Sequence, residues 1–415
     1  MIKKEIDVVI VGGGPAGLAA AISARKEGVS NVLIVERGES LGGILNQCIH
    51  EGFGVERFDE ALSGPEYMQR FIDEADKLKI PYLLNSMVLE VSHDKKLLVC
   101  SAEGLTVTHA KAVILCMGCR ERTRGQVCIP GLRPAGIFTA GTAQNLINLR
   151  GYKIGEKVVI LGSGDIGLIM ARRMTLEGAQ VLAVAEVMPY SSGLPRNMAQ
   201  CLTDFEIPLY LSHTVTEIHG KKRVEAVTIA EVDSRWKPVA GTEKRIKCDT
   251  LLLSIGLIPE NELSRKAGIA IDETTGGPVI DEDLQTSVEG IFSCGNVLHV
   301  HDLVDWVSLE GEKAGKSAAD YVKGQKEKGR MIKVRPKEGI RYVLPHQITG
   351  KQDVRFSLRV MAPERNMRLV IMDADKTVKT ISKKRVNPAE MISFTLKKEE
   401  LAGCRDISVK LENAG

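Results

Sequence analysis

Two glycine-rich turns in this sequence have the residue types that bind a dinucleotide. Residues 12–17 read GGGPAG and residues 162–167 read GSGDIG, so both fit the pattern G-x-G-x-x-G. In such a turn the first glycine permits a tight reversal, the second lets the backbone approach a pyrophosphate, and the third allows close helix–strand packing. An acid, Glu36 or Glu186, follows the third glycine after 19 residues in both copies. A carboxylate there can accept hydrogen bonds from ribose hydroxyls.

The flanking residues predict the elements that position these turns. Apolar runs at 8–11 and 158–161 are typical of strands buried on both faces. A helix follows each turn and ends near Gly28 or Gly178, and its N-terminus offers N–H groups and a positive dipole end to phosphates. A second strand then leads to the acid. Two copies of this whole plan predict an α/β fold with two Rossmann-like dinucleotide-binding domains.

Composition excludes several classes of protein. The 415 residues are 44% hydrophobic and 26% charged, as in ordinary globular chains of several domains. A net charge of +3 with 4% aromatic residues argues against a nucleic-acid partner. We find no apolar run long enough to predict a membrane span or a signal peptide. Nine scattered cysteines do not indicate a secreted disulfide framework, so a cytoplasmic location is expected.

Three further segments complete the pattern, and on them the chain resembles a known family. They are AVILCMG at 112–118, DTLLLSIGLIPE at 249–260 and LQTSVEGIFSCGNV at 284–297. With the two turns, they make residues 5–325 similar to the pyridine nucleotide–disulfide oxidoreductase superfamily. The resemblance implies FAD at the first turn and a pyridine nucleotide at the second. The implied FAD-binding residues are Gly12, Gly14, Pro15, Ala16, Gly17, Glu36, Arg37, Gly118, Gly295 and Asn296. The implied nucleotide-binding residues at the second turn are Gly162, Gly164, Asp165, Ile166, Gly167 and Glu186.

Two details refine these expectations. The family usually has Gly-Asp where this chain has Gly295-Asn296, and an amide oxygen accepts a ribitol hydrogen bond without charge, so the bond should be weaker. At the second site, NADP needs a cation for its 2′-phosphate, whereas Glu186 would repel it. Residues 187–192 contain no Arg or Lys. NAD(H) is therefore favoured over NADP(H).

The positions of the cysteines predict an enzyme without a redox disulfide. One subfamily has a cysteine pair in G-G-x-C-x-x-x-x-C, but here Leu45 and His50 occupy those positions, with Cys48 between them. Another subfamily has C-x-x-C in the central domain, and none is present there. The pair Cys116 and Cys119 lies at neither redox position and is interpreted as a buried residue plus a linker residue. A metal site at these cysteines lacks a fourth ligand, so no metal-binding residues are predicted.

Candidate catalytic residues come from two loops. His50, with Cys48 beside it, could move protons near the flavin or could be a hydrogen-bonded surface histidine. His301 lies just before an expected helix, whose N-terminus, by family resemblance, points at the flavin. Asp302 or Asp305 is expected to cap that helix.

The domain plan is discontinuous. Residues 1–120 and 257–325 are expected to form the FAD domain, with the NAD(H) domain at 121–256 between them. A polar, basic stretch at 326–337 is expected to be a linker, and period-2 alternation predicts a small β-rich domain at 338–415, for docking or oligomerisation.

Three hypotheses of function remain open. The first is an NAD(H)-dependent FAD oxidoreductase, resembling dithiol-free subunits of the cyanide synthase, opine oxidase and sarcosine oxidase type and oxidoreductases associated with glycerol-3-phosphate dehydrogenases. That resemblance implies a partner flavoprotein or other electron acceptor, in an oligomer. The second is a subunit that oxidises a small amine or hydroxy acid directly at FAD. The third is a non-catalytic nucleotide-binding subunit.

Overall fold

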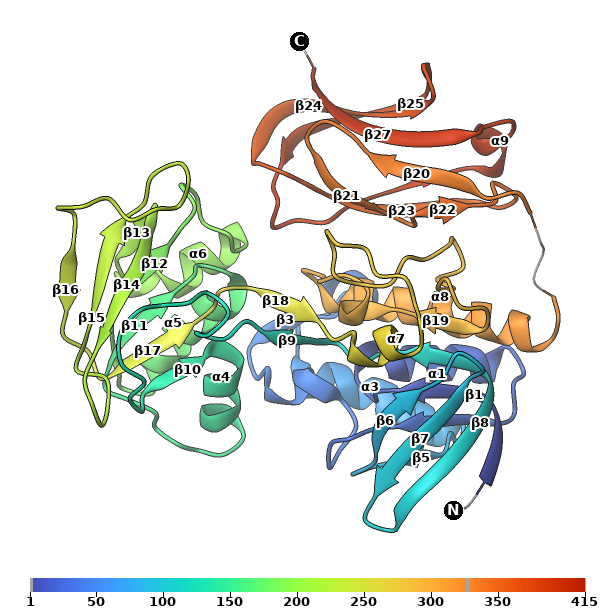
Figure 1. Cartoon of the computed structure of the whole chain (residues 1–415), viewed down its shortest axis with the longest axis horizontal. Coiled ribbons are helices and arrows are strands. Elements are labelled where there is room, and N and C mark those ends of the chain that lie inside the picture. Colours follow the sequence, from blue (N-terminus) through green and yellow to red (C-terminus); the bar gives the residue numbers. More distant parts are fainter. Residues whose placement is uncertain (1–2, 326–328, 415) are drawn as a thin grey trace. The chain divides into compact units, whose positions relative to one another are not determined.

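The computed structural model describes residues 3–325 and 329–414, which separate into two compact units (Figure 1). Unit 1 consists of the described parts of residues 1–46, 51–119 and 259–415. Unit 2 consists of residues 47–50 and 120–258. Each unit is built around its own glycine-rich turn.

The first part of unit 1 is a mixed sheet with helices on its faces. The strand order is β5-β2-β1-β8-β7-β6, with β19 also paired to β8, and β5, β2, β1, β8 and β19 run parallel. The strands of this sheet are β1 (Lys3–Val11), β2 (Val32–Val35), β5 (Tyr82–Leu83), β6 (Met87–Val91), β7 (Lys96–Ser101), β8 (Gly104–Leu115) and β19 (Ile291–Ser293). The helices are α1 (Pro15–Lys26), α2 (Val55–Phe58), α3 (Gly64–Lys77), α7 (Glu262–Lys266) and α8 (Val304–Val322). The short elements η1 (Gly43–Gln47), β3 (Glu51–Phe53), β4 (Leu62–Ser63) and η3 (Gly295–Val297) connect them.

The C-terminal part of unit 1 is β-rich and has a hydrophobic core of its own. One sheet has the order β22-β20-β27-β24-β25 and the other β21-β23-β26. The elements are β20 (Ile332–Pro336), β21 (Ile340–Leu344), β22 (Gln347–Ile348), β23 (Val354–Val360), β24 (Glu364–Asp373), β25 (Lys376–Val386), β26 (Ile392–Leu396), α9 (Lys398–Leu401) and β27 (Asp406–Asn413). Strand β20 corrects the predicted linker at 326–337. This stretch pairs with the sheet and buries the side chains of Ile332 and Val334, and residues 326–328 lie outside the described residues.

Unit 2 contains a parallel sheet of order β10-β17-β11-β12-β13 and an antiparallel sheet β14-β15-β16. Its strands are β9 (Cys119–Glu121), β10 (Ile137–Thr139), β11 (Lys157–Leu161), β12 (Gln180–Glu186), β13 (Leu209–Leu211), β14 (His213–His219), β15 (Ala226–Glu231), β16 (Lys244–Ile246), β17 (Thr250–Leu253) and β18 (Leu257–Pro259). Its helices are α4 (Ala140–Asn148), α5 (Asp165–Leu176), α6 (Pro195–Cys201) and η2 (Thr203–Phe205).

These arrangements confirm the predicted fold class, with two Rossmann-like sheets and a β-rich C-terminal region. In each Rossmann-like sheet the glycine-rich turn follows a buried strand, as the apolar runs predicted. Among the described residues, no helix combines the length and the apolar character needed to cross a membrane.

Candidate functional site

The amino-terminal cradle, which we define as Gly12–Gly17 with Glu36, has the close backbone contacts that its glycines require. Gly12 has φ +106°, and a Cβ there would lie 2.5 Å from the Cys116 carbonyl oxygen. A Cβ on Gly17 would lie 1.9 Å from the Gly12 carbonyl oxygen. Helix α1 therefore begins directly against the end of β1, with Gly14 as its N-cap and no side chain capping it. Its first N–H groups are available to an anion.

The carboxylate of Glu36 is fixed by main-chain donors. Its Oε2 accepts the N–H of Gly13 and its Oε1 accepts the N–H of Gly38, both at 2.6 Å. A carboxylate offers about four acceptor positions, so Glu36 can still accept from ribose hydroxyls. Arg37 follows it and is exposed.

Glycines also allow the late elements of unit 1 to reach this cradle. A Cβ on Gly311 would lie 2.4 Å from the Ala16 carbonyl oxygen, and one on Gly315 would lie 2.1 Å from that of Ala20. Helices α1 and α8 thus pack backbone to backbone (Figure 1). Gly295, with φ +76°, comes close to the Ala16 side chain. The predicted residues of the FAD site on β1, α1 and β19–η3 are therefore brought together within unit 1.

The space beside Gly14 fits a pyrophosphate. A Cβ on Gly14 would have the Cα of Gly43, at 3.9 Å, as its nearest neighbour, so the absence of a side chain leaves room against the backbone of the turn. Gly118, after β8, has φ +71°, and a Cβ there would meet no atom within 4 Å. The residues present fit a dinucleotide at this cradle.

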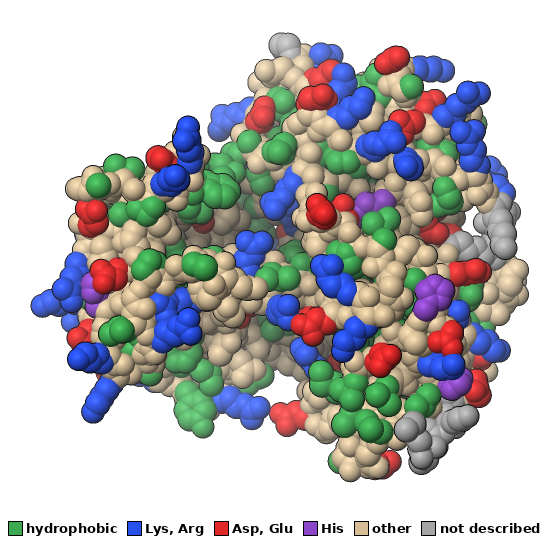
Figure 2. All heavy atoms as spheres, viewed as in Figure 1, with side chains coloured by type: hydrophobic (Ala, Val, Ile, Leu, Met, Phe, Trp, Pro, Cys, Tyr) green, Lys and Arg blue, Asp and Glu red, His purple; other side chains and the backbone are tan. Residues whose placement is uncertain are grey.

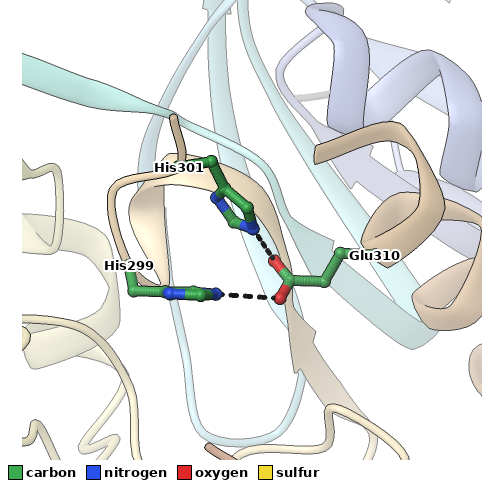
Figure 3. A group of neighbouring side chains, drawn as sticks. All are labelled: His299, His301 and Glu310. Carbon is green, nitrogen blue, oxygen red and sulfur yellow. Dashed lines mark hydrogen bonds and ion pairs between the residues drawn. The ribbon is translucent and has the colours of Figure 1, made fainter. Parts of the chain in front are cut away.

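Asn296 points toward a buried cluster rather than away from the protein. Its Oδ1 accepts the backbone N–H of His301 at 3.0 Å and lies 3.2 Å from His301 Nδ1. His301 Nε2 lies 3.5 Å from Glu310 Oε2, and His299 Nε2 lies 3.1 Å from Glu310 Oε1 (Figure 3). Gly295 donates its N–H to the same carboxylate at 2.6 Å.

This cluster has perturbed acid–base properties. Burial, and then the neighbouring His301, lower the pKa of His299 to about 4. Burial alone would raise the pKa of Glu310, but the imidazoles of His301 and His299 hold that pKa far below its usual range. Glu310 is therefore ionised and His299 neutral near pH 7.

The β-rich region of unit 1 contacts the same loop. Tyr342 Oη on β21 lies 3.2 Å from His299 Nδ1. Arg359 on β23 donates to the Val300 carbonyl at 3.1 Å and pairs with Asp302 at 3.4 Å. Neither Asp302 nor Asp305 caps α8, which corrects the sequence expectation. The N-cap is Leu303, because Asp302 turns to Arg359 and Asp305 is buried within the first turn.

The central cradle, Gly162–Gly167 with Glu186, repeats this plan in unit 2. A Cβ on Gly162 would lie 2.0 Å from the Ser254 carbonyl oxygen, and one on Gly167 would lie 2.7 Å from that of Gly162. Gly164 is the N-cap of α5, and a Cβ there would have Ser254 Oγ, at 3.7 Å, as its nearest neighbour. Asp165 and Ile166 form the first turn of the helix.

The acid of the central cradle is held by the turn and by the loop that follows β12. Glu186 is buried, and its Oε2 accepts Ser163 N–H at 2.9 Å, Ser163 Oγ at 2.6 Å and Ser192 Oγ at 2.9 Å. Its Oε1 accepts Met188 N–H at 3.0 Å. Asp165 accepts Leu194 N–H at 2.8 Å, so residues 187–194 are anchored to the turn at both ends. One acceptor position of Oε1 remains for a ribose hydroxyl.

Comparison with known proteins agrees with this geometry. The family model for the pyridine nucleotide-disulphide oxidoreductases matches residues 6–318. The chain belongs to this family.

Individual relatives show how far the similarity extends. A hydrogen cyanide synthase subunit, HcnB, of Pseudomonas protegens is 29% identical over 287 residues, which are 64% of this chain and 59% of that protein. An NAD(P)H sulfur oxidoreductase (CoA-dependent) of Pyrococcus abyssi is 27% identical over 78% of this chain and 71% of its own length. The crystal structure of T. acidophilum thioredoxin reductase superimposes with a TM-score of 0.64 at 26% identity, covering 76% of this chain and 98% of that chain.

The relatives in this family include an NAD(P)H sulfur oxidoreductase and a thioredoxin reductase by name. The match stops at residue 318, so the β-rich region lies outside it. The chain spans 59% of the cyanide synthase subunit, and its own substrate and partner are separate questions.

Two predicted catalytic residues, Cys48 and His50, belong to unit 2 rather than unit 1. Gln47 explains this placement, because its buried side chain donates to the Gly141 carbonyl at 2.9 Å and to Gln144 at 3.0 Å on α4. Burial raises the pKa of the Cys48 thiol to about 12. Burial, and then Arg196 and Arg172, lower the pKa of His50 to about 4. At pH 7 the thiol is protonated and the imidazole neutral.

Two other cysteines lie close together. Cys116, after β8, and Cys294, after β19, have their sulfur atoms 3.4 Å apart, and both are buried. A hydrogen bond between the thiols and burial raise the pKa of Cys294. No local pattern marks this pair, because 178 residues separate its members. The pairing of β8 with β19 brings them together.

On the face seen in Figure 2, Lys and Arg side chains are interspersed with Asp and Glu side chains. This face therefore shows no extended patch of one charge. This agrees with the small net charge.

Proposed function

We propose that this chain exchanges hydride with NAD(H) through FAD and passes electrons to or from a partner flavoprotein or another acceptor, without a redox disulfide. The observation that carries the proposal is the pair of cradles. Their glycine-rich turns have matching geometry, but different groups donate hydrogen bonds to Glu36 and to Glu186. Glu36 and the N-terminus of α1 would hold FAD, together with Gly295 and the backbone of Asn296, whose side-chain oxygen already accepts from His301. Glu186 and the N-terminus of α5 would hold NAD(H). When bound, FAD supplies the hydride chemistry, which side chains cannot provide.

The electrostatics of the central cradle support NAD(H) over NADP(H). The Glu186 carboxylate lies within a ring of donors, so a 2′-phosphate there would face a buried negative charge. A ribose hydroxyl can instead donate to Oε1.

The thiol chemistry supports the absence of a redox disulfide. Disulfide exchange requires an accessible thiolate. Cys116 and Cys294 are 7% and 0% exposed, and burial keeps the Cys48 thiol protonated. The positions that carry the pair in one subfamily are Leu45 and His50.

The subunit names of relatives support a partner protein. The relative from Pseudomonas protegens is described as a subunit of hydrogen cyanide synthase. We propose that this chain likewise works beside a second protein, in an oligomer, and that the β-rich region contributes to that assembly.

A second candidate, direct oxidation of a small amine or hydroxy acid, is favoured by one cavity. A cavity of about 350 Å³ in unit 1 is lined by Glu56, Arg57, Phe58, Asp305 and Leu309. Arg57 could pair with a substrate carboxylate, although one of its nitrogens is already paired with Glu312.

Anaerobic reduction separates the candidates. The purified chain should be yellow, and NADH without oxygen should bleach the flavin band. Full bleaching should consume about one NADH per flavin both in the wild type and in Cys116→Ala with Cys294→Ala, because no disulfide takes up a second electron pair. A protein bleached by a small amine or hydroxy acid but not by NADH would favour the second candidate. Consumption of about two NADH per flavin by the wild type and of about one by the cysteine variant would contradict the dithiol-free proposal.

A further inference from the structure

The cluster of His299, His301 and Glu310 has the shape of a metal site that the function above does not use. The two Nε2 atoms face the Glu310 carboxylate, one at each of its oxygens (Figure 3), and the three ligand atoms lie within 4.8 Å of one another. The nitrogen–oxygen separations are 3.1 and 3.5 Å. Ligands bound at about 2.0–2.1 Å to zinc would be separated by roughly 3.0–3.4 Å. The two nitrogen–oxygen separations are therefore close to those expected around a bound ion.

Groups hydrogen-bonded to Nδ1 of each imidazole orient the two rings so that Nε2 could bind a metal ion. Asn296 Oδ1 already accepts the backbone N–H of His301, so the facing Nδ1 of that ring must be the donor in their 3.2 Å contact. The Nε2 of His301 then faces the carboxylate either protonated or with a lone pair. Metal-binding histidines usually donate their second N–H to an acceptor in this way.

His299 has the same arrangement on the other side. Its Nδ1 lies 3.2 Å from Tyr342 Oη, which also accepts a hydrogen bond from Arg359. An oxygen that accepts from Arg359 can accept from His299 Nδ1 as well. In the tautomer with the proton on Nδ1, the Nε2 lone pair of His299 is directed at Glu310.

The site is nearly closed, and two arginines lie near it. The side chains of His299 and His301 are 1% and 2% exposed, and that of Glu310 is 15% exposed. Arg359 is paired with Asp302 at 3.4 Å, and Arg355 stacks over the Trp306 ring. Two imidazoles and a buried carboxylate at this spacing hold either protons or a metal ion between them.

We propose that His299 Nε2, His301 Nε2 and the Glu310 carboxylate bind one divalent transition-metal ion, with zinc as the expected occupant. Two imidazoles and one carboxylate form a ligand set used for zinc and for iron(II). A water molecule or another small donor completes the coordination. The ion fastens residues 296–303 to α8 and, through Tyr342, to the β-rich region. Zinc sites are usually recognised in a sequence by the spacing of cysteines. That spacing cannot reveal a site made of two histidines and a glutamate.

Metal analysis of the full chain tests the proposal. The chain is purified without a histidine tag, loaded with FAD, stripped with a chelator, reloaded with Zn²⁺ and dialysed before elemental analysis. We expect about one zinc per chain in the wild type. His301→Ala and Glu310→Gln should bind zinc at least about tenfold more weakly. His219→Ala is the matched control, because His219 contacts Thr228 on β15 at 2.8 Å and belongs to the other unit.

Two outcomes would overturn it. Wild-type protein that retains no zinc, iron or manganese would leave a proton-bridged cluster in place of a metal site. Zinc that binds the wild type, His301→Ala and Glu310→Gln equally would place the ion elsewhere. If His301→Ala loses its FAD or its circular-dichroism spectrum, Glu310→Gln decides in its place, by competition for Zn²⁺ with a chromogenic chelator against the wild type. These results are independent of whether NADH bleaches the flavin, so failure here leaves the proposed function intact.

Discussion

The two cradles share one plan and hold their acids by different means. Glu36 of the amino-terminal cradle accepts two main-chain N–H groups at 2.6 Å. Glu186 of the central cradle accepts two hydroxyls, from Ser163 and Ser192, in addition to main-chain donors. The first acid is therefore fixed by the backbone around it, whereas the second is partly fixed by the side chains of a loop.

This difference matches a resident ligand and a visiting one. The amino-terminal cradle is backed by α8 through Gly311 and Gly315, and these backbone contacts cannot open without separating two helices. Residues 187–194 are fastened to the central cradle by hydrogen bonds, each of which contributes about 0.5–1.5 kcal/mol. A loop held this way can rearrange each time a nucleotide binds and leaves.

The largest expected effect comes from breaking the backbone contact of the amino-terminal cradle. Gly12→Ala should cost at least about 3 kcal/mol, because an alanine at φ +106° is strained and its Cβ overlaps the Cys116 carbonyl. The protein should lose FAD and melt at a lower temperature. The ratio of flavin to protein absorbance and a thermal melt measure both changes.

Gly14→Ala and Gly164→Ala form a matched pair for this experiment. A Cβ at these two positions would have no protein atom closer than 3.9 and 3.7 Å, so both variants should melt near the wild-type temperature. Gly14→Ala should weaken FAD alone, and Gly164→Ala should raise the KM for NADH alone. If either variant lowered both affinities, the cradles would not be assigned to separate nucleotides.

The next effect concerns the acids. Glu186→Gln should leave FAD bound and shift the preference for NADH over NADPH by at least about tenfold, or about 1.4 kcal/mol, because the charge that repels a 2′-phosphate is removed. Steady-state kinetics with both nucleotides measure the shift. Glu36→Gln should instead lower FAD occupancy. Equal use of NADH and NADPH by the wild type, unchanged in Glu186→Gln, would contradict the proposed role.

The parts of this comparison that a sequence can predict are local ones. The turns, the strands before them and the acids after them follow from short-range patterns, and the fold class built on them is confirmed. The hydrogen-bond donors to each acid come from residues that meet only in the folded chain. Ser192 carries no pattern of its own, and Gln47 draws residues 47–50 into unit 2 through bonds to residues 94 and 97 positions later.

The candidate site is hardest to predict where its residues come from distant parts of the chain. His301 was singled out by its place before α8, but its partner Glu310 was hidden within the helix. Tyr342 lies on a strand beyond the family match, and alternation predicted a β-rich region without its contact to His299. A period-2 pattern predicts which face of a strand is buried. It does not predict which residues pack against that face.

The smallest expected effect tests the loop itself. Ser192→Ala removes the 2.9 Å hydrogen bond from the Ser192 hydroxyl to Glu186 and frees an acceptor position on Oε2. A ribose hydroxyl would then compete with one donor fewer for the Glu186 carboxylate. The KM for NADH should therefore fall about two- to fivefold, because one hydrogen bond contributes about 1 kcal/mol. Ser191→Ala is the control, because the Ser191 hydroxyl accepts the Gly193 N–H at 3.3 Å within the loop and does not support the acid. A rise in KM for Ser192→Ala would mean that the hydroxyl binds the nucleotide directly, and the loop would then be part of the binding site and not its cover.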